Sequence, residues 1–183
     1  KKKKTMAANT TAAENTAVGT DAMTATTTGS SNAAFGTDAL KSNSTGASNT
    51  ALGSYSLDAN TTADNNTAVG VHALGANTTG FDNVALGNNT LKTNTTGDTN
   101  TAIGKNALFS NTTADDNTAV GFNSLSDNST GVNCSALGSG ALENNTTANN
   151  NTAVGLNALY SNTTAPDNTA VGKDALLLST TGS

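Results

Sequence analysis

The segment Asn66-Thr67-Ala68-Val69-Gly70 begins a 17-residue unit, residues 66–82, that decides the fold of this 183-residue chain. The unit recurs ten times without insertion or deletion, with the consensus N-T-A-V-G-x-(N/D)-A-L-x-x-N-T-T-(G/A)-x-(N/D). We number its positions 1 to 17 from the leading Asn. A fixed short period indicates stacked structural units rather than a globule with a single core. The position-5 turn glycines are Gly19, Gly36, Gly53, Gly70, Gly87, Gly104, Gly121, Gly138, Gly155 and Gly172.

The repeats fill almost the whole chain. The first complete copy begins at Asn15, and the tenth begins at Asn168. Residues 1–14 hold a partial repeat that starts with the basic run Lys1–Lys4, and residues 15–183 hold the ten repeats, with no separate second domain. No cap is visible at either end. We therefore expect either a piece of a longer protein or ends that stack onto further chains.

The composition indicates a thin interior. Leu, Ile, Val and Phe number 28 of the 183 residues, a proportion that is typical of disorder when net charge is high. Here the formal net charge is only −5, and a disordered segment has no reason to keep its phase over ten repeats. Because Ala, Thr, Asn and Gly dominate, we predict a folded chain with small, tightly packed interior side chains.

Charge and hydropathy exclude two classes of partner. Arg is absent, and beyond Lys1–Lys4 the chain has four Lys against 13 acidic residues, whereas nucleic-acid binding needs clustered cations. No apolar stretch approaches the roughly 20 residues of a membrane span. A single cysteine, Cys134, excludes an intrachain disulfide framework and is compatible with an exposed, oxidising location.

The repeat is too short for the helix pair of an α-solenoid, which needs about 30 residues or more. It predicts an all-β fold: a parallel β-solenoid (β-roll or β-helix) with one repeat per coil and about ten to eleven coils. T-A-V reads as a short strand, and the following Gly turns the chain through a positive φ or a close backbone approach. The N-T-T segment predicts a second short strand, and the A-L pair predicts either a third strand or a tight bend. Asn and Thr columns are expected to form side-chain ladders.

Alternation within the strand predicts self-association. Position 3 is always Ala and position 4 always a large apolar residue, as in Ala102 and Ile103, and the position-9 column includes Leu108. Adjacent strand residues point to opposite faces. We infer that the small face fills the coil and that the large face packs against another copy of the chain; the reverse assignment also predicts association. The expected partner is the chain itself, as a homo-oligomer or filament.

The N-T-A-V-G and A-L-x-x-N-T-T-G elements resemble repeats of bacterial and phage tail-fibre-like proteins. They are also similar to the head repeats of trimeric autotransporter adhesins, whose S-V-A-I-G-type motifs form a left-handed parallel β-roll with coils shorter than 17 residues. Residues 83–87, Asn-Val-Ala-Leu-Gly, come closest to the adhesin form. The resemblance covers residues 15–183. It implies an extracellular, cell-surface or virion appendage, a trimer, and a host or cell-surface receptor or glycan as a further partner.

Candidates for chemistry are few. His72 is the only histidine and occupies a variable position, and Cys134 replaces the leading Asn of one repeat with no basic residue recurring beside it. Acidic residues recur at the last two positions without a calcium-binding pattern. These acidic residues are Asp64, Asp82, Asp98, Asp115, Asp116 and Asp167. We therefore expect a non-enzymatic protein with no catalytic site, no metal and no cofactor.

Position 12 carries a recurrent Asn-(Ser/Thr)-Thr sequon, which reads either as a structural Asn ladder or as glycosylation sites. Its members are Asn43, Asn60, Asn77, Asn94, Asn111, Asn128, Asn145 and Asn162, with one more at Asn9. The alternative function is ice binding through Thr and Asn columns. Because the adjacent columns of Thr78 and Thr79 cannot both face outward on a flat strand, an Asn77-x-Thr79 pair would have to serve.

The function that this sequence favours is a rigid fibre, filament or adhesin shaft that assembles through solenoid packing and possibly by end-to-end stacking.

Overall fold

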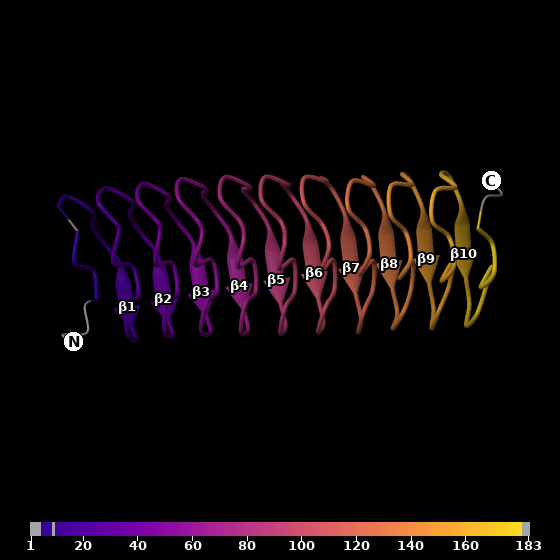
Figure 1. The fold of residues 1–183 in the computed structure, drawn as a ribbon, viewed down its shortest axis with the longest axis horizontal. Helices are drawn as coiled ribbons and strands as arrows, with labels where there is room; N and C mark the ends of the chain where they lie inside the picture. The colour runs from indigo at the N-terminus through magenta and orange to yellow at the C-terminus, as the bar shows by residue number, and fades with distance from the viewer. Residues whose placement is uncertain (1–4, 9, 181–183) are drawn as a thin grey trace.

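The computed structural model describes residues 5–8 and 10–180, which form one file of coils stacked along a single axis (Figure 1). Each coil contributes one three-residue strand, and the strands lie side by side in sequence order as one ten-stranded sheet. They are β1 (Thr16–Val18), β2 (Ala33–Phe35), β3 (Thr50–Leu52), β4 (Thr67–Val69), β5 (Val84–Leu86), β6 (Thr101–Ile103), β7 (Thr118–Val120), β8 (Ser135–Leu137), β9 (Thr152–Val154) and β10 (Thr169–Val171).

The predicted all-β parallel solenoid is confirmed. All pairings between neighbouring strands are parallel, no helix occurs in the described residues, and about nine turns connect the ten strands. Lys1–Lys4, Asn9 and residues 181–183 lie outside the described part of the chain, so the predicted basic start and the first sequon are not placed.

The strand register equals the sequence period. Ala102 of β6 lies between Ala85 of β5 and Ala119 of β7, and Thr101 pairs with Thr118 in the same register. Residues 17 apart therefore form straight columns along the rod, and every repeat position has one environment. This one environment is why position 3 accepts only Ala and position 5 only Gly across ten copies.

Three columns supply the apolar part of the interior. In the coil of residues 100–116, Ala102 at position 3, Ala107 at position 8 and Leu108 at position 9 are all fully buried. Leu108 is the only large apolar side chain that this coil buries, whereas Ile103 at position 4 keeps 38% of its surface exposed. The small face of the strand therefore lies inside and the large face outside.

Left-handed residues shape each coil outside the strand. In residues 100–116 they are Asn106, Leu108 and Asp116, with φ of 59°, 51° and 58°. Asn and Asp adopt this region at less cost than other side chains, which explains their preference at positions 7 and 17. Leu has no such advantage, and a left-handed Leu costs about 1–2 kcal/mol. Full burial of its side chain, which contributes about 1.5–3 kcal/mol, offsets that cost.

The prediction of a second strand at N-T-T is wrong. The segment is a bend, because Asn111 Nδ2 donates a hydrogen bond to the carbonyl oxygen of Ala114 three residues later, at 3.0 Å. Of the two alternatives for A-L, the structure has the tight turn. There the Ala107 amide donates to the Gly104 carbonyl oxygen, and the Asn111 amide to that of Leu108, both at 3.2 Å.

Backbone hydrogen bonds join consecutive coils outside the sheet as well. The Leu108 amide donates to the Ser124 carbonyl oxygen of the next coil at 3.0 Å. On another side of the same coil, the Asp116 amide donates to the carbonyl oxygen of Asp98 in the preceding coil at 3.2 Å. Each coil is thus bonded to its neighbours around its circumference, which satisfies buried backbone groups without a second strand.

The position-5 glycines turn the chain at the end of each strand, where no other residue fits. Gly104 has φ of +126°, a conformation that side chains rarely adopt. A Cβ atom there would lie 2.5 Å from the carbonyl oxygen of Gly121 in the next coil. Both the dihedral angle and the close approach of successive coils therefore require glycine.

Candidate functional site

The position-12 asparagines form a ladder inside the rod. Each is fully buried and hydrogen-bonded to its equivalent in at least one neighbouring coil. Asn111 Nδ2 donates to Asn94 Oδ1 at 2.9 Å, and Asn111 Oδ1 accepts from Asn128 Nδ2 at 3.2 Å. The ladder runs through Asn43, Asn60, Asn77, Asn94, Asn111, Asn128, Asn145 and Asn162.

A second ladder runs beside it at position 1. Asn100 Oδ1 accepts a hydrogen bond from the Asn117 backbone amide at 3.1 Å, and Asn100 Nδ2 donates to the Ala114 carbonyl oxygen at 2.8 Å. Asn111 donates to that same oxygen, so position 15 ties the two ladders together. Hydrogen-bond chains of this kind, once satisfied, rigidify a low-dielectric interior. They supply the specificity that bulky apolar side chains supply elsewhere.

The position-12 ladder stops where the residue type changes. Position 12 is Thr26 in the first repeat and Ser179 in the last. Among the described residues, the buried side-chain oxygens without a hydrogen-bond partner are Thr26 Oγ1 and Asn162 Oδ1, one at each end of the ladder. The hydroxyls of Thr26 and Ser179 therefore do not replace the amide in this column.

We expect no glycan on the eight position-12 sequons. The Nδ2 atom that would carry a glycan is engaged inside a fully buried column. In Asn111, for example, it donates to Asn94 Oδ1 of the preceding coil at 2.9 Å and to the Ala114 carbonyl oxygen at 3.0 Å. The intact mass of folded protein from a host that glycosylates these sequons should equal that of the bare chain. A folded, glycosylated chain would contradict the interior position of the ladder.

Cys134 interrupts the position-1 ladder. Its backbone amide still donates to Asn117 Oδ1 at 2.9 Å, but its Sγ reaches the Ala148 carbonyl oxygen only at 3.3 Å. The side chain is buried, and burial raises the pKa of the thiol. A buried, protonated thiol is a poor nucleophile.

Cys134→Asn should therefore stabilise the chain. It restores a strong amide donor to the Ala148 carbonyl oxygen and a carbonyl acceptor toward Asn151, worth about 1–2 kcal/mol together. Urea denaturation followed by circular dichroism would measure the gain. The matched control is Cys134→Asp, which keeps the shape and loses the donor, and should destabilise the chain. Equal effects of the two variants would show that no ladder passes through this position.

The outer surface of the sheet carries two parallel columns, which we call the sheet face. One is the position-2 column, mostly Thr. The other is the position-4 column, Val18, Phe35, Leu52, Val69, Leu86, Ile103, Val120, Leu137, Val154 and Val171. No position-4 side chain is buried, and Leu137 in mid-rod keeps 52% of its surface exposed. An apolar stripe therefore runs the length of the rod.

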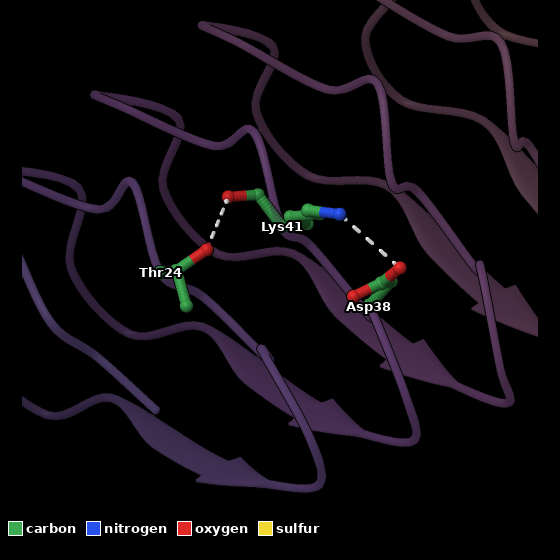
Figure 2. A network of polar contacts seen from close by, with 3 residues as sticks. All are labelled: Thr24, Asp38 and Lys41. Carbon is green, nitrogen blue, oxygen red and sulfur yellow. Dashed lines mark hydrogen bonds and ion pairs between the residues drawn. The ribbon is translucent and has the colours of Figure 1, made fainter. Parts of the chain in front are cut away.

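The charged side chains lie on the flanks of the rod. Every acidic residue, and every lysine after Lys1–Lys4, occupies position 6, 7, 10, 11, 16 or 17. In one flank Lys41 Nζ lies 3.2 Å from Asp38 Oδ2, and Thr24 Oγ1 donates to the Lys41 carbonyl oxygen at 3.4 Å from the preceding coil (Figure 2). Ion pairs this exposed contribute little to stability. Their placement matters more, because it leaves the sheet face uncharged.

Partial burial raises the pKa of three carboxyl groups, those of Asp58, Asp98 and Glu143. For Asp98, desolvation is the largest cause; the backbone amide of Phe81 opposes it by donating a hydrogen bond, and the charge of Asp115 adds to it. The three groups lie in three different coils. They therefore do not form a common acid–base site.

The remaining titratable side chains do not form a cluster that could serve as an active site. His72 stacks on the ring of Tyr55 in the preceding coil, with centroids 5.0 Å apart. Within the described residues there is no pocket and no group of three or more His, Cys, Asp or Glu side chains placed to hold a metal ion. None of their secondary structure is a helix long and apolar enough to cross a bilayer.

The Asn-x-Thr pair considered for ice binding is not displayed. Thr79 at position 14 is exposed, but Asn77 is fully buried in its ladder, and Thr78 Oγ1 donates to the Thr95 carbonyl oxygen at 2.9 Å. Position 14 therefore presents one column of threonines without a partner column two residues away. The sheet face presents two columns two residues apart, at positions 2 and 4, but position 4 varies from Val to Phe.

Position 16 has a further role that was not predicted from the sequence, because its Asp and Asn side chains accept hydrogen bonds from backbone amides of the preceding coil. Asp98 Oδ1 accepts a hydrogen bond from the Phe81 amide of the preceding coil at 2.9 Å, and Asp115 does the same for Asp98 at 2.8 Å. The signal was the recurrence of Asp or Asn at this position. The role of these side chains depends on which backbone amide of the preceding coil faces them. The sequence does not give the path of the coil that brings the two together.

No protein-family model, curated protein or solved structure matches the chain.

Proposed function

We propose that this chain is a non-enzymatic structural protein, a stiff shaft segment of an extracellular fibre, adhesin or virion appendage. The observation that carries the proposal is the unbroken axial bonding. Strand pairing and turn-to-turn backbone hydrogen bonds join each coil to the next, and two internal Asn ladders add to them over most of the rod. Bending such a rod would strain many bonds at once, so its length is well defined.

The extracellular setting is supported by the resemblance of the repeats to tail-fibre-like and adhesin-head repeats, and by the poverty in cysteine. A receptor or glycan partner would contact the exposed variable positions 6, 10 and 16. These positions differ from coil to coil, so they can encode a binding surface, and at position 16 the Asp and Asn side chains also bond the preceding coil.

Ice binding, the alternative function, needs an exposed Asn-x-Thr pair, and Asn77 of that pair is fully buried. The sheet face is a poor substitute, because Phe35, Leu52 and Val69 project to different heights in neighbouring strands. A thermal-hysteresis assay should show ordinary ice growth.

Small-angle X-ray scattering tests the shaft. We expect an elongated particle whose length grows by about 4.8 Å per repeat. Deleting residues 100–116, one full repeat, should shorten the particle by that amount and leave its cross-section unchanged. Deleting only residues 100–108 breaks the register and should abolish the rod. A compact wild-type particle, or a cross-section that changes with the full-repeat deletion, would refute the proposal.

A further inference from the structure

We infer that the sheet face joins this chain lengthwise to a second copy of itself, with the two rods aligned along their axes. The inference rests on the proposed shaft and names the surface and the partner through which the shaft assembles. Its elements are the exposed apolar column at position 4, the Thr column at position 2 and the exclusion of charge from both.

Folding of one chain does not explain the apolar column. The interior is already filled from positions 3, 8 and 9, and the strand directs position 4 to solvent. Strand propensity would be served equally well by Thr, the usual residue at position 2. Yet position 4 is Val, Leu, Ile or Phe in all ten copies. A surface position that stays large and apolar indicates burial against a partner.

The absence of charge supports the same conclusion. Positions 1 to 5 contain no Asp, Glu, Lys or His in any of the ten repeats, while the flanks hold all 13 acidic residues. Charged residues are depleted at the centre of protein interfaces and enriched at their rims. The sheet face has that organisation along the whole rod, with the flanks as its rim.

The dimensions of the face select a partner that covers all of it. Ten strands spaced by about 4.8 Å, each about 10 Å wide, give a flat area of about 450–500 Å² per copy, or about 1,000 Å² for two. Specific interfaces bury about 1,200–2,000 Å² in total. A short peptide would bury far too little. A full-length partner approaches the range, and exposed apolar residues that follow the turn glycine, such as Val71, Phe122 and Leu156, would extend the area.

The row spacing of the face fits a second copy of this chain. The side chains form rows one strand spacing apart for ten rows. A helical or irregular partner has no rows at the strand spacing and would leave gaps within a few rows. A second copy has the same row spacing, so its apolar side chains can pack between those of the first along the whole length.

Sedimentation velocity of the full chain over a concentration series tests the inference. We expect reversible association for the wild type. The variant Leu86→Lys/Ile103→Lys/Val120→Lys places three charges on the sheet face and should weaken association at least about tenfold. The matched control, Thr96→Lys/Thr113→Lys/Thr130→Lys, places the same charges in the same coils at exposed position 14 and should associate like the wild type. Circular dichroism checks that both variants fold.

A second measurement covers the case in which the sheet-face variant does not fold. In single variants, the thiol of Ile103→Cys should be labelled more slowly as protein concentration rises, while that of Thr113→Cys should not respond. A wild type that stays monomeric at every concentration, or sheet-face and control variants that associate equally, would overturn the inference. A monomer that still scatters as a rod would leave the shaft standing, whereas a compact particle would remove both.

Discussion

Ala102→Asp is expected to unfold the chain or open its central coils, with a loss of at least about 4 kcal/mol. Ala102 is fully buried between Ala85 and Ala119, in a column where no larger residue occurs. A carboxyl group there has neither space nor a partner, and ionisation would require water in the interior. Loss of the cooperative thermal transition, followed by circular dichroism, would measure the effect.

The matched control for that variant is Asn106→Asp in the same coil. Asn106 has φ of 59°, a conformation that Asp tolerates, and Asp already occupies position 7 in other repeats as Asp21, Asp38 and Asp174. The Asn106→Asp variant loses one partly buried hydrogen bond, from Asn106 Nδ2 to Asn123 Oδ1, worth about 1 kcal/mol. Equal tolerance of Asp at both positions would contradict the assignment of inside and outside.

Gly104→Ala is expected to destabilise the chain by about 3 kcal/mol or more. The new Cβ atom would lie 2.5 Å from the Gly121 carbonyl oxygen, and φ of +126° is strained for any side chain. Relief requires the two coils to move apart, which weakens the axial hydrogen bonds on both sides. Urea denaturation gives the loss directly.

Gly140→Asn is the control for the glycine effect. Gly140 also has a positive φ, 66°, but it occupies position 7, where other coils carry Asn. Its added Cβ would meet Asn157 Oδ1, the far end of a side chain that can move. We expect a neutral change or a gain of about 0.5–1 kcal/mol, because the substitution restricts the unfolded chain. A large loss here would mean that positive φ alone, rather than contact between coils, governs the position-5 glycines.

The sequence was sufficient to predict the stacking, because a constant period without insertions requires equivalent environments. The contrast between Ala102 and Ile103 at adjacent strand positions predicts two different faces, but which face lies inside follows only from the burial of Ala102 and the exposure of Ile103. Charge never enters positions 1 to 5, but this pattern gains its meaning only once the strand places positions 2 and 4 on the outer surface.

The path of the coil between strands was not predictable in the same way. N-T-T has the composition of a strand, and only the hydrogen bond from Asn111 to Ala114 across three residues makes it a bend. Leu108 gives no local signal for a left-handed conformation, since burial rather than propensity holds it there. The role of position 16 depends on a backbone amide of the preceding coil, as when Asp98 accepts a hydrogen bond from the Phe81 amide.

Spin-label distances would show whether each repeat is one rung of a straight stack. Labels would be placed at position 14 in Cys134→Asn chains diluted with unlabelled protein. The pair Thr28→Cys/Thr164→Cys spans eight rungs, and the pair Thr79→Cys/Thr164→Cys spans five. We predict separations of about 38 Å and about 24 Å, with a difference of about 14 Å for three rungs. Distances that do not scale with the number of rungs would contradict the stack.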